Sequence, residues 1–425
     1  MHEDGRVYGN KIVKKVVCWD AIDERNVWNE YETHAYVWEH APWCACVRSH
    51  IEPKKNPAIY NMNMMRYPRW LVTELTYRCP LSCFYCSNPT HMSTKNELST
   101  EDWLSVFSQA RDMGCVQLGL TGGEPLMRND LTTLVKEARA MGFYTNLITS
   151  AVGLTRKKID VLKMAGLDSV QISFQAENRQ LNEYIGGKDT YDKKVDMMRA
   201  VKEAGMPLTL NVVIHRLNID RMPDICKFCD SMNPDHVEIA SVQYHGWANT
   251  NRRQLLPTPE QVQRAQKAIE TYQQSSTSGV YYVLPDLIEK RAKPCQQGWG
   301  TTYICINPQG NVTPCLSAHT LPSVKSIIPN VRKHTLEAIW NGEVFSKYRG
   351  IDWMTEGAKH HPRRDEDLGG CRCQTFLLTG NECAMDPVDD TSVHHDTFQR
   401  RVMEDYSTPV DLKSLLPRRV ATTPR

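Results

Sequence analysis

Between residues 69 and 285 the chain alternates short apolar runs with segments whose apolar residues recur every three or four positions. The apolar runs start near Trp70, Val116, Phe143, Ser169, Leu208 and His236, and each has the length of one buried strand. Six strand-then-helix units predict an α/β fold, with a parallel sheet covered by helices. Because there are six units rather than eight, we expect a partial, open (β/α)6 barrel of the TIM type.

The segment after the first apolar run shows the helical pattern well. Its apolar residues at i, i+3, i+4 and i+7 form one face, made of Trp103, Val106, Phe107 and Ala110. Ser99 lies three residues before Asp102, which resembles a capping box at the start of a helix. We therefore expect a helix that begins just after Ser99 and buries this face.

Three cysteines follow the first predicted strand directly. Cys79, Cys83 and Cys86 have C-x3-C-x2-C spacing. Thiolates suit iron–sulfur clusters, and three ligands without a fourth nearby predict a cubane cluster with one open iron. The alternatives are a zinc knuckle or buried free thiols, but zinc sites usually use C-x2-C pairs and four ligands.

The other strand ends are polar as well. The second strand runs into Thr121-Gly-Gly-Glu-Pro125, whose glycines let the backbone approach a ligand and whose amides can face a polar group. The next ends carry Ser150, Gln175, His215 with Arg216, and Gln243. In barrels of this kind the chemistry lies at the carboxyl ends of the strands, which is where the cysteine loop also falls.

Composition narrows the class of protein. The chain is 41% hydrophobic and 24% charged with a net charge of +2, which indicates a globular protein without nucleic acid or membrane as its main partner. It has no apolar run of about 20 residues, and its start lacks the features of a secretory signal. Fifteen cysteines then indicate metal or redox chemistry in the reducing cytoplasm.

With the three-cysteine motif and Gly122-Gly-Glu-Pro125, residues 66–285 resemble a radical S-adenosylmethionine (SAM) enzyme. The resemblance implies that Cys79, Cys83 and Cys86 hold a 4Fe–4S cluster whose open iron binds the amino and carboxylate groups of SAM. The bound SAM then splits into methionine and a 5′-deoxyadenosyl radical. The resemblance also implies cofactor contacts at Tyr85 (adenine), Gly122, Gly123 and Glu124 (amino group), Ser150, Ser173 and Asn211 (carboxylate or ribose), and at Pro125 and Gln175.

A second cysteine region spans residues 286–392. Cys295, Gly310 and Cys315 have the spacing that opens a SPASM domain, and Asn307–Gly310 predicts a turn between two short strands. The resemblance implies that one auxiliary cluster, which we expect to be 2Fe–2S, is held by Cys295, Cys315, Cys371 and Cys373.

The ligands of a second auxiliary cluster are replaced. By resemblance its positions fall on Ala358, His361, Asp367 and Asp389, which make a poor iron–sulfur site because thiolate is the usual ligand. Cys383 could substitute for one of them, although a single thiolate is not enough. His360, His361 and Asp367 could instead bind zinc or iron, but we favour a solvated, metal-free loop.

The remaining segments carry weaker signals. Residues 1–65 predict a partly ordered extension, with a metal site from His40, Cys44, Cys46 and His50 as the less favoured alternative. Residues 393–425 predict a loosely ordered end. The other cysteines of residues 66–392 are expected to be core thiols, with Cys226 and Cys229 on one helix face and Cys115 and Cys305 at strands.

From about Tyr67 to Pro387 the chain resembles the PqqE family more narrowly, for instance in Glu74–Leu81 and Gly369–Gln374. This resemblance implies a Glu–Tyr carbon–carbon cross-link in the peptide PqqA during pyrroloquinoline quinone biosynthesis. It also implies a PqqD-like peptide chaperone and an external electron donor. The alternatives are a related enzyme that modifies another ribosomal peptide or a protein side chain, and a non-catalytic iron–sulfur redox or scaffold protein.

Overall fold

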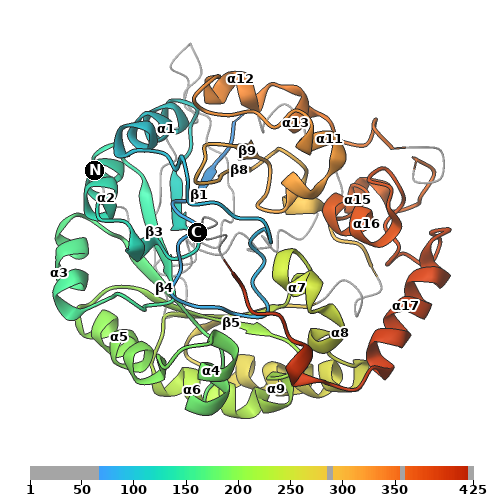
Figure 1. Ribbon diagram of the computed structural model, residues 1–425, viewed down its shortest axis with the longest axis horizontal. Coiled ribbons are helices and arrows are strands. Elements are labelled where there is room, and N and C mark those ends of the chain that lie inside the picture. The colour runs from blue at the N-terminus through green and yellow to red at the C-terminus, as the bar shows by residue number, and fades with distance from the viewer. Residues whose placement is uncertain (1–66, 285–290, 355–358, 420–425) are drawn as a thin grey trace, which may run out of the picture. The chain divides into compact units, whose positions relative to one another are not determined.

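The computed structural model of the chain describes residues 67–284, 291–354 and 359–419 (Figure 1). All six predicted strands are present, and each begins within one residue of its predicted start. They are β1 (Trp70–Glu74), β2 (Gln117–Thr121), β3 (Tyr144–Thr149), β4 (Ser169–Phe174), β5 (Leu208–Ile214) and β6 (His236–Ser241). The α/β class and the open parallel sheet are confirmed.

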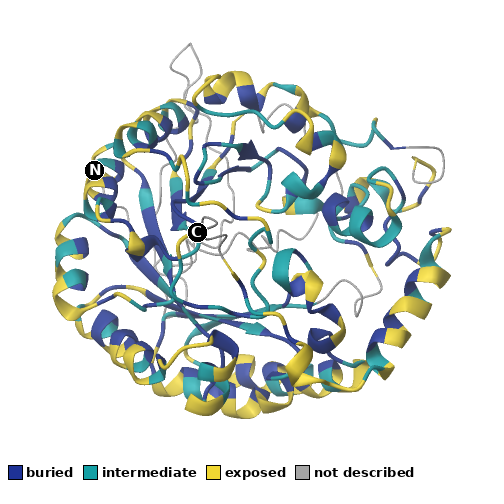
Figure 2. Cartoon of the chain, viewed as in Figure 1, coloured by how far each residue is buried: buried dark blue, intermediate teal, exposed yellow. Residues whose placement is uncertain are grey.

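Helices connect the strands, and most of them lie along the outer face of the sheet (Figure 1). They are α1 (Thr100–Asp112), α2 (Leu131–Ala140), α3 (Arg156–Met164), α4 (Arg179–Gly186), α5 (Tyr191–Glu203), α6 (Met222–Ser231), α7 (Gly246–Thr250), α8 (Arg252–Leu255), α9 (Pro259–Ser275), and the 3-10 turns η4 (Pro125–Met127) and η5 (Ile219–Arg221). Figure 2 shows that the outward sides of α1 to α6 are exposed and their inward sides are buried.

Helix α1 forms as predicted. Both hydrogen bonds of the capping box between Ser99 and Asp102 are present, so two backbone donors at the helix start have partners. The four residues of the predicted face are the ones that α1 buries, namely Trp103, Val106, Phe107 and Ala110. Local periodicity and the cap together were sufficient to specify this element.

The sheet is larger than the predicted six strands. The order is β7-β6-β5-β4-β3-β2-β1-β8-β9, which adds β7 (Gly279–Val283), β8 (Tyr303–Ile306) and β9 (Val312–Thr313). Strand β7 pairs in parallel with β6 at the edge and is only half-buried, so its sequence lacks a clear inward face. The six-strand prediction was therefore too small.

The predicted hairpin of the second cysteine region is confirmed, but its place was not foreseen. Strands β8 and β9 pair antiparallel around the turn, and β8 pairs in parallel with β1, with Leu71 opposite Ile304. A strand edge beside β1 offers unpaired backbone groups, and β8 satisfies them. The two cysteine regions therefore share one sheet.

Short helices follow in the second cysteine region, and the long helix α17 and a short turn lie beyond it, in the C-terminal segment. They are η6 (Cys295–Gln297), η7 (Ala318–Thr320), α11 (Pro322–Lys325), α12 (Leu336–Trp340), α13 (Glu343–Ser346), α15 (Arg364–Asp367), α16 (Arg372–Thr379), α17 (His395–Ser407) and η8 (Leu412–Ser414).

The prediction of a loosely ordered C-terminal end was wrong for residues 393–419. Helix α17 buries Phe398 and Val402 against Leu256 and Val388. Its end is fixed by Arg216, whose guanidinium donates to the carbonyls of residues 405, 406 and 408. Arg216 was expected among the polar strand ends of the site, but it caps this helix instead.

Several sequence predictions concern buried thiols or segments outside the described residues. Cys115, Cys226, Cys229 and Cys305 are buried, as expected of core thiols. The extension 1–65, its candidate metal residues and Ala358 lie outside the described residues. No helix within the described ranges is long and apolar enough to span a membrane.

Candidate active site and auxiliary thiol cluster

The three-cysteine loop lies at the carboxyl end of β1, directly beside β2 (Figure 1). Cys83 is buried and Cys79 and Cys86 are half-buried. Burial raises the pKa of Cys79 to about 11 and that of Cys83 to about 12, and it raises the pKa of Cys86. Charges on Cys79 and Cys86 also raise the pKa of Cys83, so the three thiols lie within electrostatic reach of one another.

This donor set fits a metal cluster. The three thiols interact electrostatically, and a thiolate buried without a cation is costly, so iron would take the place of their protons. Three ligands from one loop leave a coordination position on the cluster for another molecule, as the spacing predicts.

The end of β2 fixes one side of the loop through its backbone. The amides of Gly123 and Glu124 donate to the carbonyls of Thr76 and Arg78, at 2.7 and 2.8 Å. A Cβ on Gly123 would lie 2.5 Å from the Arg78 oxygen, so only glycine allows this approach. The Gly123 amide thus faces a polar group, the Thr76 carbonyl of the cysteine loop, and a contact of Gly123 with SAM stays a prediction.

The loop after β6 fixes the other side. The amides of Trp247 and Ala248 donate to the Cys86 carbonyl at 2.9 and 3.2 Å. Gly246 has a φ of 52°, and a Cβ there would lie 2.0 Å from the Asn88 oxygen. Segments far apart in the sequence thus hold the cysteines in place before any ligand binds.

Glu124 joins the ends of β2 and β3. Its fully buried carboxylate accepts from the Leu126 amide at 3.1 Å, the Thr149 hydroxyl at 2.7 Å, and both the amide and the hydroxyl of Ser150. Four donors use the acceptor sites of both oxygens. The structure thus brings Glu124 and Ser150 together, and their contacts with SAM stay predictions.

Tyr85 and Gln175 also meet, and Gln175 is held in turn by Lys194, a residue that the sequence analysis missed. The Gln175 amide donates to the Tyr85 hydroxyl at 3.1 Å, and Lys194 donates at 2.8 Å to both the Gln175 side chain and the Ser173 carbonyl. Tyr85 also packs against His215, with ring centroids 5.4 Å apart. Burial lowers the pKa of His215 to about 3, so this imidazole is neutral.

Lys194 is fully buried on α5, within electrostatic reach of Cys83 and Cys79 in the cysteine loop. Burial lowers its pKa to about 8, while the charges of Cys83 and Glu124 act to raise it. Its sequence neighbours Asp192 and Lys193 suggest an exposed helix face, so nothing in the sequence pointed to this lysine.

Asn211 lies opposite Ser173 in neighbouring strands. Its amide donates at 3.0 Å to Glu238 on β6, which also accepts from Gln171 at 3.2 Å. Burial raises the pKa of Glu238. Glu238 is a carboxylate within the apolar run His236–Ser241, which indicates a polar group inside the barrel. The sequence analysis did not use this signal.

The four auxiliary cysteines form a closed ring of side-chain contacts. Cys295 contacts Cys315 and Cys371, and Cys373 contacts the same two residues. Hydrogen bonds within the ring raise the pKa of Cys295 and Cys373 and lower the pKa of Cys315 and Cys371. Four convergent thiols fit an iron–sulfur cluster held entirely by the protein.

His245 is a further residue at this ring that sequence reasoning missed. It is buried in the loop after β6, and its hydrogen bond and charge lower the pKa of Cys371. The neighbouring Gly246 and Trp247 contact the first cysteine loop, so one short segment touches both thiol sites.

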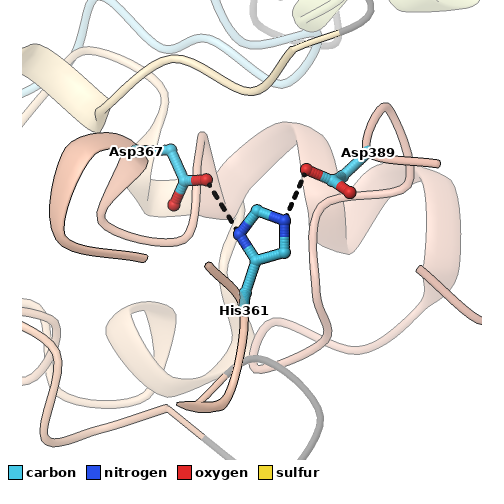
Figure 3. Close-up of side chains that lie close together, drawn as sticks. All are labelled: His361, Asp367 and Asp389. Carbon is cyan, nitrogen blue, oxygen red and sulfur yellow. Dashed lines mark ion pairs between the residues drawn. The ribbon is translucent and has the colours of Figure 1, made fainter. Parts of the chain in front are cut away.

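The replaced positions of the second auxiliary site do come together. Figure 3 shows His361 between Asp367 and Asp389, which face opposite ring nitrogens at 3.4 and 3.0 Å. All three side chains are buried, and their ligand atoms lie within 4.8 Å of one another. Arg363 pairs with Asp389 at 2.7 Å, so that carboxylate already has a cationic partner.

The expectation of a solvated loop is wrong for His361, Asp367 and Asp389, which are buried, and the other expected ligands are also corrected. His360 is exposed and does not belong to the group of His361, Asp367 and Asp389. Cys383 lies near the Tyr348 hydroxyl, at 4.0 Å, and is not part of the group either. One imidazole and two carboxylates on opposite ring edges do not resemble an iron–sulfur ligand set.

Comparison with known proteins agrees with this arrangement. Residues 73–229 match the radical SAM superfamily, and residues 295–374 match the SPASM iron–sulfur cluster-binding domain. The structure of Streptococcus suis SuiB bound to S-adenosylmethionine is similar, with 18% identity and a TM-score of 0.64 over 76% of this chain and 78% of that one. That of anSMEcpe with bound AdoMet is 14% identical, with a TM-score of 0.57 over 79% and 96%. Two successive stretches of the chain therefore match the radical SAM superfamily and the SPASM domain, and the chain shares the fold of the SuiB and anSMEcpe structures.

Proposed function

We propose that this chain is a radical SAM enzyme that modifies a peptide, with Cys79, Cys83 and Cys86 as ligands of a 4Fe–4S cluster and the four-thiol ring as ligands of one auxiliary cluster. The observation that carries the proposal is the three-thiol loop, clamped at the carboxyl end of β1 beside polar strand ends. The peptide substrate is supported by similar structures, since SuiB was solved with its precursor peptide SuiA and anSMEcpe with a peptide.

When bound, the cluster and SAM supply a radical that can remove a hydrogen atom from an unreactive carbon. The chain's own residues orient these groups and exclude water. Gly123, Glu124 and Trp247 hold the cysteine loop, while Lys194 and Gln175 hold the Tyr85 hydroxyl.

For the substrate, we infer a Glu–Tyr cross-link in a PqqA-like peptide, delivered by a PqqD-like chaperone. This rests on the sequence resemblance from Tyr67 to Pro387. The altered second auxiliary site, with His361, Asp367 and Asp389, favours the second candidate, a related enzyme acting on another ribosomal peptide or a protein side chain.

One experiment separates these functions. The reconstituted protein is incubated with PqqA, PqqD, SAM and a low-potential reductant, with a Cys79/Cys83/Cys86→Ala variant as control. Loss of two hydrogens from the peptide supports the cross-link. Formation of 5′-deoxyadenosine with an unchanged peptide overturns it in favour of the second candidate. If 5′-deoxyadenosine does not form, the protein is a non-catalytic iron–sulfur protein.

A further inference from the structure

The C-terminal segment 411–419 runs from α17 to the cysteine loop. It is attached at its start by the Asp411 amide, which donates to the Gln254 side chain at 2.7 Å. Further on, Leu415 is buried in a small apolar cluster with Leu255, Phe84 and Tyr85, two of which belong to the cysteine loop. The segment therefore packs on the loop itself.

Asn251 joins the segment to the loop through one side chain. Its amide group donates to the Leu416 carbonyl at 2.8 Å and to the Phe84 carbonyl at 2.9 Å, and its oxygen accepts from the Leu416 amide at 2.8 Å. Every polar atom of this buried amide is used, so the approach of the segment to the loop is specific.

This path brings Arg418 into the cysteine loop. Its side chain is 5% exposed, and its guanidinium donates to the Tyr77 carbonyl at 2.7 Å. Its backbone amide donates to the Ser82 carbonyl at 3.2 Å, between Cys79 and Cys83. Arg418 therefore contacts the loop both before and after its first cysteine.

Among the described residues no close ion pair of Arg418 is seen, but the buried Glu74 carboxyl lies within its electrostatic reach. Its Nε is buried and makes no hydrogen bond to a described residue. A buried charge is unfavourable unless opposite charges nearby offset it. The charge of this guanidinium acts on the thiols of Cys79 and Cys86 and on the buried Glu74 carboxyl.

We propose that Arg418 is a positioning residue for the radical-generating cluster, whose negative charge it offsets and whose reduction it favours. This inference rests on the proposed 4Fe–4S cluster at Cys79, Cys83 and Cys86. When that cluster accepts one electron from an external low-potential donor, its net charge becomes more negative by one, while Arg418 gains neither a proton nor an electron. A fixed cation beside the thiolates stabilises the reduced state more than the oxidised state.

The next residue provides a matched control. Arg419 has the same side chain and the same formal charge, but it is exposed, so solvent screens it from the loop. Comparison of Arg418→Gln with Arg419→Gln therefore separates a specific buried charge from the net charge of the tail. Arg418→Lys keeps the charge and loses the planar guanidinium.

The test is an EPR-monitored redox titration of the reconstituted full-length protein. In Arg418→Gln we expect the ratio of reduced to oxidised loop cluster to fall about tenfold at a given potential, which is about 59 mV for a one-electron couple. Arg419→Gln should titrate as wild type does, and the auxiliary cluster should keep its potential in every variant. An unchanged midpoint in Arg418→Gln with full iron content overturns the proposal.

Two further variants make each outcome decisive. If Arg418→Gln does not assemble the loop cluster, Arg418→Lys decides: assembly near the wild-type potential supports the charge, and failure overturns it in favour of packing. The Cys79/Cys83/Cys86→Ala variant identifies the EPR signal of the loop cluster, because that signal should disappear in it. If wild type and variant give the same EPR signals, the proposed loop cluster does not exist. That result differs from a loop cluster that is present but has the same midpoint potential in wild type and Arg418→Gln, which overturns only the role of Arg418.

Discussion

The two thiol sites of this chain are held in opposite ways. The loop of Cys79, Cys83 and Cys86 is fixed by backbone hydrogen bonds from the ends of β2, β6 and the C-terminal segment, and its thiols do not form a ring. The four auxiliary thiols come from distant positions and contact one another directly.

This difference indicates how each site is suited to its proposed task. A loop held through its backbone keeps its three sulfurs in place while one coordination position stays open for SAM. A ring of four side chains from separate segments ties those segments together and leaves no open position. The first arrangement suits chemistry and the second suits structure or electron transfer.

The largest expected effect comes from removing the open site. Cys79/Cys83/Cys86→Ala should lose about four of about six irons per chain and abolish 5′-deoxyadenosine formation, because the cluster would lose all its protein ligands. The EPR signal of the auxiliary 2Fe–2S cluster should survive. Loss of both signals would contradict the independence of the two sites.

Next, Gly123→Ala should displace the loop without removing a ligand. The new Cβ would lie 2.5 Å from the Arg78 oxygen, which is backbone and cannot move aside freely. We expect 5′-deoxyadenosine formation to fall on the order of 100-fold. Gly186→Ala is the control: its carbonyl binds the Ser82 amide, but its Cβ has ordinary contacts at 3.6 Å or more. Equal rates for the two variants would argue against the clamp.

Removing one thiol of the auxiliary ring should affect the auxiliary cluster and leave the loop cluster intact, which is the reverse of the triple cysteine variant. Cys371→Ser removes a sulfur that contacts Cys295 and Cys373, so we expect loss of about two irons with the loop signal retained. Iron and sulfide analysis with EPR measures both. Cys115→Ser, which changes a buried thiol outside the ring, should keep all iron.

Glu74, the last residue of β1, should make stability depend on pH. Burial raises its pKa from 4.5 to about 7, so the folded chain keeps a proton that the unfolded chain has released. Its stabilisation is complete below pH 4.5 and is lost as the pH rises to about 7, by on the order of 3 kcal/mol.

Urea unfolding at pH 5 and pH 7 measures this effect. Glu74→Gln removes the titrating group. The unfolding free energy of the wild type relative to the variant should therefore be lower at pH 7 than at pH 5. A constant difference would show that Glu74 titrates normally in the folded protein.

The smallest effect on metal content is expected at the second auxiliary site. His361→Ala should leave iron at about six per chain, because the imidazole and its two aspartates are not iron–sulfur ligands. About ten irons in the wild type would contradict this account. Loss of one zinc or iron from the variant would instead support a single ion held by His361, Asp367 and Asp389.

The sequence alone determined the elements whose signals are local. The six strands begin within one residue of their predicted positions, and α1 buries its predicted face. When one side of a helix or strand is buried, its apolar residues recur at a regular spacing over a few positions, and capping residues mark where a helix begins. The position of the cysteine loop after β1 follows from the same local information.

Tertiary structure alone decided which distant segments meet. It placed β8 beside β1, closed the thiol ring, buried Lys194 within electrostatic reach of the loop, and carried Arg418 to the cysteines. The partner of a hairpin edge or of a buried cation is selected by packing between segments hundreds of residues apart. No local window of the sequence records that choice, which is why a buried arginine and its exposed neighbour look alike in the sequence.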